Sequence, residues 1–284
     1  MFIYEKFKSN NHIKTNIMKS IIRTGILLLF ICVAGILNAQ TSQELVVPLS
    51  NAGKSGTLEV GIMYGSIKVI GTSVKDVVVN VSTEQKKVKE PDKNGLKRIA
   101  NNSFGLTAKE EDNYVKVNTD LSNKNVMLEI QVPANFNLKL KAVNNGDISV
   151  EKVNGEMEIS HVNGEITLTD VSGSAVVGTT NGDIKANFNS VTENTPMAFT
   201  TFNGDVDVTF PADIKASVKM QSNMGDIFTD FDMVMKKGTP KEEKDAEKGI
   251  YKVSLEEWTR GDISGGGPEI TFKNFQGDII IRSK

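Results

Sequence analysis

The chain of 284 residues has little of what redox, metal and nucleophilic chemistry needs, because it holds one cysteine and two histidines. Cys32 and His12 both lie near the N-terminus, so His161 is the single histidine beyond residue 39. A chain without a second cysteine forms no internal disulfide. A lone histidine, with no cysteine or second histidine, makes neither a zinc site nor a catalytic triad. We therefore expect no catalytic residue, no metal and no cofactor, and we expect His161 at the surface beside a turn.

An excess of charge of one sign is also lacking. The sequence carries 33 basic and 35 acidic residues, a net charge of −2, and the part beyond residue 39 carries 28 basic and 34 acidic residues. A mildly acidic chain argues against nucleic acid as a partner and against electrostatic attachment to anionic membranes.

No apolar run reaches the length of a membrane span, which needs about 20 residues. The run at 25–37 has 13 residues, follows a basic start and precedes a small residue, Ala39. This pattern predicts a secretory signal peptide at 18–39, cleaved near Ala39. We interpret Met18 as the true start and residues 1–17 as an N-terminal extension.

Two alternatives stay open for this segment. The apolar run would serve as an uncleaved anchor if cleavage failed. Cys32 would be lipidated if the chain were a lipoprotein. Lipoprotein cleavage requires a small residue before the cysteine, however, and the bulky Ile31 stands there. After cleavage near Ala39, we expect no membrane span in the mature chain.

A short repeat dominates the middle of the chain. Glycines recur every nine residues, at Gly146, Gly155, Gly164, Gly173 and Gly182. Most of them follow an asparagine, a pair that favours turns because both residues tolerate positive φ. Apolar or small residues stand two and four places after each glycine, which is the period-two pattern of a half-buried strand. Each unit therefore predicts one short strand and one corner, within a repeat architecture.

A unit of nine residues cannot close a core alone. Two arrangements remain: a meander of small hairpins, or a solenoid in which two units make each coil. The later Gly-Asp corners, at 181–183, 203–205 and 224–226, are spaced slightly more widely than two units, as a doubled unit with a loosened corner would be. This spacing favours an all-β solenoid, with coils stacked about 4.8 Å apart, as a single domain at 40–284.

The rest of the chain varies this theme. Residues 43–84 have strand patterning and predict the first coils or a cap. Two segments rich in charge, 85–103 and 236–248, are interpreted as solvated loops. Glycine-led strands return towards the C-terminus, where we expect the last strand to close the far edge of the stack.

Two columns of polar residues are expected along the corners. If two units make one coil, the acids after the glycines line up (Asp147, Glu165, Asp183, Asp205, Asp226), and so do the asparagines before them (Asn145, Asn163, Asn181, Asn203). Calcium would relieve repulsion between stacked carboxylates, but each unit lacks the second glycine of the calcium-binding repeat. We interpret the acids as structural turns, with a calcium site as the alternative, and the asparagines as a stabilising ladder.

The aromatic residues are few, at 6% of the chain, and most are phenylalanines. Trp258 is expected to cap the edge of the solenoid, with an exposed sugar-stacking or partner-binding role as the alternative. Seven phenylalanines are expected to fill a wider C-terminal core: Phe199, Phe202, Phe210, Phe228, Phe231, Phe272 and Phe275.

The repeated N-G-D-I pattern, the V-P-A-N-F-N-L-K-L segment at 132–140 and the closing G-G-G-P-E-I…G-D-I-I-I segment at 265–281 resemble the DUF4097 family ("putative adhesin"). The resemblance covers residues 45–284. It implies a right-handed β-solenoid-like fold and an extracytoplasmic place in a bacterial envelope, and it brings no catalytic residue. The L-N-A ending of the leader is similar to signal peptides of the Bacteroidota.

Three functions are compatible with these features. The first is a secreted or envelope protein without enzymatic activity, an adhesin or structural module that binds an envelope or surface protein or a glycan. The second is a periplasmic accessory that senses envelope stress through a membrane partner. The third is an enzyme acting on polysaccharides, for which abundant acids would supply the carboxylate pair, although only fold-level analogy supports it.

Overall fold

The computed structural model describes residues 42–83, 105–119, 125–237, 241–245, 250–254 and 258–284. The chain divides into two units, Met1–Gln40 and Thr41–Lys284, and every described residue belongs to the second. The predicted extension, the signal peptide at 18–39 and the charged segment 85–103 lie outside the described residues.

The described residues form strands and no helix. Nineteen strands join one sheet and two form a separate hairpin. The strands are β1 (Ser42–Val47), β2 (Thr57–Thr72), β3 (Val77–Thr83), β4 (Leu106–Glu111), β5 (Tyr114–Thr119), β6 (Val126–Pro133), β7 (Asn137–Asn144), β8 (Ile148–Glu151), β9 (Asn154–His161), β10 (Ile166–Gly178), β11 (Ile184–Val191), β12 (Met197–Thr200), β13 (Val206–Phe210), β14 (Ala216–Met224), β15 (Ile227–Thr229), β16 (Met233–Lys236), β17 (Lys241–Asp245), β18 (Ile250–Ser254), β19 (Thr259–Ile263), β20 (Glu269–Gln276) and β21 (Ile279–Ser283).

Two nine-residue units make one coil. Ile148 of β8 lies beside Ile166 of β10, and Ile166 lies beside Ile184 of β11, all in parallel pairs. Partners are therefore two repeat units apart in the sequence. Between β11 and β13 the offset is larger, since Ile184 pairs with Val206. The chain is all-β and solenoid-like, and the meander of hairpins is excluded for the repeat region.

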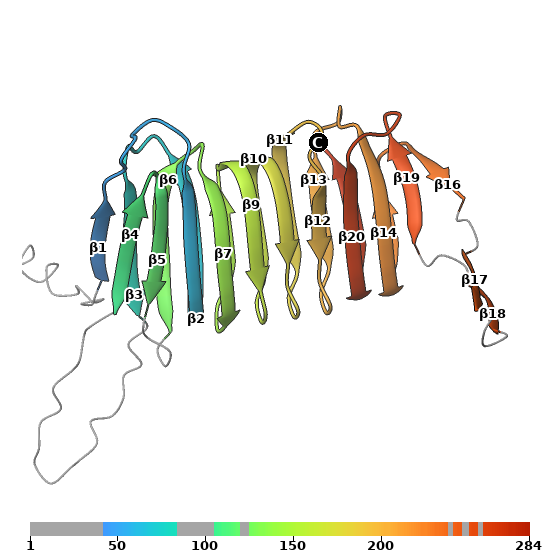
Figure 1. Cartoon of the computed structure of the whole chain (residues 1–284), viewed down its shortest axis with the longest axis horizontal. Coiled ribbons are helices and arrows are strands. Elements are labelled where there is room, and N and C mark those ends of the chain that lie inside the picture. Colours follow the sequence, from blue (N-terminus) through green and yellow to red (C-terminus); the bar gives the residue numbers. More distant parts are fainter. Residues whose placement is uncertain (1–41, 84–104, 120–124, 238–240, 246–249, 255–257) are drawn as a thin grey trace, which may run out of the picture. The chain divides into compact units, whose positions relative to one another are not determined.

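The coils build two rows of parallel strands. We call the row of β8, the first half of β10, β11, β13, β21 and β15 face A. The row of β7, β9, the second half of β10, β12, β20 and β14 is face B. Figure 1 shows the strands of face B side by side in this order. The chain crosses from one face to the other at each corner. Glycines lie at many of these corners, whereas the segments 192–196 and 211–215 turn without one.

The core lies between the two faces. Alternate side chains of most strands point inwards and are buried. Equivalent residues of successive coils therefore stack in columns, such as Ile148, Ile166 and Ile184 on face A. Burial of such side chains stabilises the fold by about 1.5–3 kcal/mol each. Each coil covers the open edge of the coil before it, so neighbouring coils together exclude water from the column.

Phenylalanines fill the later coils. Phe188 stacks on Phe210, and Phe199 stacks on Phe272, with 5.4 Å between ring centroids in each pair. The core role was predicted correctly for Phe199, Phe210 and Phe272, and Phe231 packs partly against the core. It was wrong for Phe202, Phe228 and Phe275, whose side chains are 50%, 50% and 38% exposed. Phe202 and Phe275 occupy outward positions beside a corner. The alternation of apolar and polar residues did not show where each corner begins.

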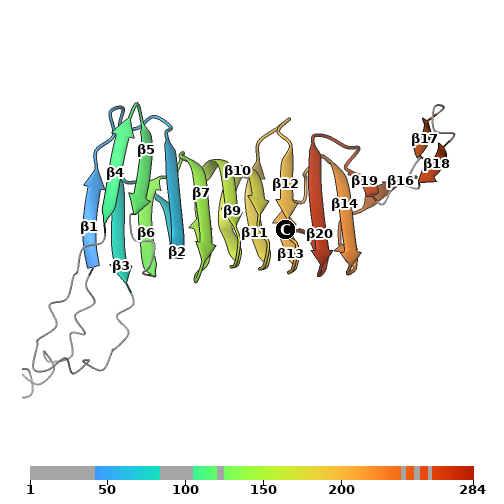
Figure 2. The same cartoon turned by 60° about the horizontal axis from the view of Figure 1, so that its bottom comes forward.

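The last coil lies inside the stack. β20 pairs with β12 on one side and with β14 on the other, while β21 lies between β13 and β15. Figures 1 and 2 both show β20 between β12 and β14. The prediction that the last strand closes the far edge was therefore wrong. Insertion gives both strands a backbone partner on each side. It also places Phe272 against Phe199, whereas at an edge position one side of Phe272 would lack a neighbouring coil.

The two ends of the described sheet depart from the parallel pattern. β2 is a complete coil, whose first half pairs with β7 and whose second half pairs with β8. β1 and β3 pair antiparallel, as do β4 and β5. Within the segment 236–248, interpreted above as a solvated loop, β17 is a strand that pairs antiparallel with β18. Strand pairing there was missed because the charged composition resembles that of a loop.

The interior position of the last coil predicts slow amide exchange at 270–281. Its strands have backbone partners on both sides, whereas β15 pairs only with β21 among the described strands. Hydrogen exchange followed by mass spectrometry should show protection of β20 and β21 equal to that of β12 and β13. Exchange of 270–281 at the rate of 227–229 would contradict the order of the stack.

The close approach of successive corners predicts a strong effect of Gly204→Ala. Gly204 has φ +138°, and a Cβ there would overlap with the carbonyl oxygen of Gly182. We expect a loss of about 1–3 kcal/mol of stability, seen as a lower melting temperature. Gly61→Ala is the matched control, because a Cβ at Gly61 meets nothing within 4 Å, and it should leave the melting temperature nearly unchanged.

Candidate functional site

A ladder of asparagine side chains runs along one corner of the stack. Asn163 donates from Nδ2 to Oδ1 of Asn144 at 2.7 Å, Asn181 donates to Asn163 at 2.8 Å, and Asn203 donates to Asn181 at 2.7 Å. The first member was predicted wrongly, since Asn145 instead donates to Oδ1 of Asn125 at 3.2 Å. The amides of Asn163 and Asn181 both donate and accept along the column, so the ladder links successive coils and offers little to a ligand.

The acids after the glycines form a second column, and their carboxylates cap the backbone of the next coil. Asp147 accepts from the Glu165 N–H at 2.9 Å, and Asp183 accepts from the Asp205 N–H at 2.9 Å. Asp278, absent from the predicted ladder, stands between Asp205 and Asp226: its N–H donates to Asp205 at 2.8 Å, and its Oδ1 accepts from the Asp226 N–H at 2.9 Å. Charge-assisted bonds to N–H groups stabilise the stacked carboxylates.

No group of three or more metal-ligating side chains occurs among the described residues. In the acid column, the carboxylates of Asp147, Asp183, Asp205 and Asp278 each accept a backbone N–H. Glu165 instead accepts from Lys185 Nζ at 2.8 Å and from the Thr167 hydroxyl at 2.8 Å. Structural use of these acids agrees with their interpretation as turns.

A third column, which the sequence did not reveal, lies just inside the corners. In each of five coils a polar side chain donates to the carbonyl of a corner glycine. The pairs are His161 with Gly146 at 2.7 Å, Thr179 with Gly164 at 3.1 Å, Thr201 with Gly182 at 3.0 Å, Asn274 with Gly204 at 2.7 Å and Ser222 with Gly277 at 3.0 Å. The available signal was a polar residue three places before each corner glycine.

His161 belongs to this inner column and is 3% exposed, so its predicted surface position was wrong. Its Nε2 lies 2.7 Å from the Gly146 carbonyl oxygen, which fixes the neutral tautomer with the proton on Nε2. Nδ1 is buried with no hydrogen-bond partner in the described structure. Burial lowers the pKa of His161, and the bond to Gly146 and the nearby Asp147 only partly oppose it. The residue is a neutral structural donor.

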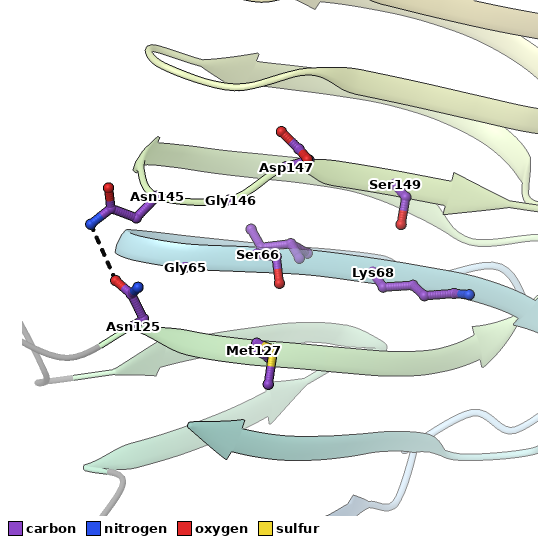
Figure 3. Close-up of a pocket in the computed structure, with 10 residues that line it drawn as sticks. Gly65, Ser66, Lys68, Asn125, Met127, Asn145, Gly146, Asp147 and Ser149 are labelled. Carbon is purple, nitrogen blue, oxygen red and sulfur yellow. Dashed lines mark hydrogen bonds between the residues drawn. The ribbon is translucent and has the colours of Figure 1, made fainter. Parts of the chain in front are cut away.

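A shallow hollow of about 380 Å³ lies near Gly65 and Gly146, between β6, β2 and β8. Figure 3 shows Asn145 turned towards Asn125 at its border. Lys68, its one cationic side chain, binds Glu151 at 2.8 Å. This pairing leaves the hollow no unpaired cation for a ligand.

A second hollow, on face B, has different chemistry. Its volume is about 400 Å³. We call it the phenylalanine groove, and it is lined by Thr179, Thr200, Thr201, Phe202, Gln221, Asn223, Lys273 and Phe275. β12, β20 and β14 supply its side chains, together with the corners that follow β10 and β12.

Two stacked rings form one border of this groove. Phe202 and Phe275 lie with ring centroids 4.6 Å apart and planes at 2°. Their outward positions, next to the asparagine corners, expose them to solvent. Exposed apolar surface of this kind marks binding sites more often than scattered single residues do.

Polar side chains also line the groove. In the register of face B, Thr200 lies beside Lys273, and Lys273 lies beside Gln221. Lys273 is exposed and makes no ion pair among the described residues. The groove therefore combines an aromatic surface with one unpaired ammonium group and has no acidic lining residue.

Trp258 lies close to this region of face B. Lys219 Nζ is 4.2 Å from the centroid of the Trp258 ring, a cation–π contact of about 0.5–1 kcal/mol at an exposed site. Trp258 directly precedes β19, which pairs antiparallel with β14. The tryptophan contacts the outer surface of the stack there.

Comparison with known families agrees with this geometry. The family model described as Toastrack DUF4097 matches residues 136–264. This segment of the chain is similar to the Toastrack DUF4097 family. The resemblance drawn from the repeats is thereby confirmed, and the match spans the coils from β7 to β19. No curated protein matches the chain.

Solved structures similar to this chain are distant. "A putative cell adhesion protein" from Clostridium sporogenes is 13% identical with a TM-score of 0.43, covering 86% of this chain and 100% of that one. "A putative adhesin" from Bacteroides fragilis is 12% identical with a TM-score of 0.33, covering 87% and 98%. Likeness at this level carries no conclusion about function. No helix in the described part of the chain has the length and hydrophobicity of a membrane span.

The buried histidine predicts a pH-dependent stability that His161→Thr removes. The unfolded side chain titrates near pH 6.5, whereas burial lowers the pKa in the folded state. The unfolded state therefore binds more protons below about pH 6.5, and stability falls as the pH is lowered. Threonine supplies the same hydroxyl donor as Thr179 and Thr201 in neighbouring coils. The fall in melting temperature from pH 7.5 to pH 5.0 should be smaller for the variant than for the unchanged chain. Equal falls would refute the assignment of His161 as a buried neutral residue.

The capped acid column predicts that calcium is dispensable. Because these carboxylates already accept backbone N–H groups, a melting scan in calcium and one in chelator should give the same midpoint. A melting midpoint that calcium raises in the unchanged chain but not in Asp205→Asn would contradict this prediction and show a cation site in the acid column.

Proposed function

We propose that this chain is a secreted or envelope protein without enzymatic activity, an adhesin or structural module that binds a surface protein or glycan. The observation that carries the proposal is the exposed, stacked pair Phe202 and Phe275 beside a polar groove. A ligand that covers these two apolar rings gains binding free energy, because removal of apolar surface from water is favourable.

The faces of the stack suit such a role. Ion pairs link side chains of adjacent coils, as between Arg282 and Asp207, where two nitrogens lie 2.9 and 3.0 Å from the carboxylate oxygens. Lys185 similarly reaches Glu165. Residues fixed on paired strands hold a binding surface more rigidly than residues on loops do.

The proposed location is extracytoplasmic, either periplasmic or on the cell surface. The leader pattern at 18–39, with cleavage near Ala39, supports it. The proposed winding of the coils is right-handed, because parallel strands of one sheet joined by a crossover adopt that hand in about 98% of cases.

The test of location is fractionation of cells that express the full chain. We expect recovery outside the cytoplasm, with a mature N-terminus at Gln40 by mass spectrometry. Cytoplasmic recovery with residues 18–39 retained would contradict the proposal.

The test of adhesion compares cells that express the chain with cells that carry an empty vector, on surfaces coated with matrix protein or glycan. Retention of the first alone supports the proposal. Cross-linking to a membrane protein without adhesion would favour the sensing role. New reducing ends after incubation with polysaccharides would show an enzyme.

A further inference from the structure

The lining of the phenylalanine groove carries one positive charge and no negative charge. Lys273 is its one charged lining residue and has no ionic partner among the described residues. Phe202 and Phe275 stack face to face and are both exposed, so together they present an apolar surface. An ammonium group beside this surface favours a ligand that has both an anionic group and an apolar surface.

The groove runs along the stack. Gly178, Thr200, Lys273 and Gln221 lie side by side in successive coils of face B. Neighbouring strands are about 4.8 Å apart, a distance close to the length of one pyranose unit in an extended glycan. A chain lying along the groove would therefore present one sugar to each coil.

The polar lining suits hydroxyl groups better than a peptide backbone. Thr200 and Asn223 offer a hydroxyl and an amide, which can both donate and accept. An extended peptide usually binds by adding a strand to an open sheet edge. β12 and β20 have strand partners on both sides, so this part of face B has no open edge.

We propose that the phenylalanine groove binds an acidic glycan, a chain of sugars that carry carboxylates. Lys273 binds a carboxylate, Phe202 and Phe275 contact the C–H face of a sugar ring, and Thr200 and Asn223 bond to hydroxyls. This inference rests on the proposed binding function and names the ligand class for one site of it.

The test measures binding of the purified full chain to polygalacturonate by calorimetry. Methyl-esterified polygalacturonate, which lacks the charge, and poly-L-glutamate, which has the charge on a peptide, are the comparison ligands. We expect preference for polygalacturonate, and weaker binding as salt is raised.

Three variants assign the site. Lys273→Gln should lower the affinity for polygalacturonate about tenfold, the scale of a charged hydrogen bond, and abolish the preference over the ester. Phe275→Leu should weaken binding of both the acid and the ester. Lys141→Gln is the matched control, because Lys141 is exposed in the same column of face B and makes no ion pair among the described residues. It should leave binding unchanged.

Several results would overturn the inference. Absence of binding to polygalacturonate would do so, as would equal losses in Lys273→Gln and Lys141→Gln. Binding of poly-L-glutamate as tight as that of polygalacturonate would show an acidic peptide site instead. Unchanged melting temperatures of the variants would show that they are folded. Whole-cell adhesion that persists without polygalacturonate binding would leave the proposed function standing and refute only the ligand class.

Discussion

The fold depends on the close approach of backbone to backbone at the corners. Corner glycines such as Gly182 and Gly204 lie so near the preceding corner that a Cβ would overlap with its carbonyl oxygen. That approach lets parallel strands of successive coils pair in register, which satisfies the N–H and C=O groups of each coil through its neighbours. A single coil of two units buries few side chains on its own, so the pairing and the core form together.

At these corners, polar side chains form hydrogen bonds with the N–H and C=O groups that have no backbone partner. The inner column, with His161 and Thr179, donates to glycine carbonyls, while the acid column accepts N–H groups. Most of the polar groups at the corners are therefore already hydrogen-bonded within the fold. Residues such as Asp147 resemble ligands in the sequence, yet they already accept hydrogen bonds within the stack, which leaves the outward side chains of the faces to interact with partners.

The candidate site arises where this regular surface changes composition. Elsewhere several lysines pair with acids of a neighbouring coil, as Lys68 does with Glu151 and Lys185 does with Glu165. No acid lines the phenylalanine groove, and its two stacked rings stand two residues before their corner glycines, where the earlier corners have Val162 and Thr180. Phe202 and Phe275 are far apart in the sequence, and only the insertion of the last coil makes them neighbours.

Most of the strands, the corners and the two-unit coil could be predicted from the sequence, because alternation and Asn-Gly turns act over a few residues. The order of the coils, the burial of His161 and the pairing of Phe202 with Phe275 could not. These depend on which columns of side chains match across long separations. A single-residue shift also decides which of Asn144 and Asn145 joins the ladder, and the nine-residue period cannot specify that because two asparagines stand side by side before that corner glycine.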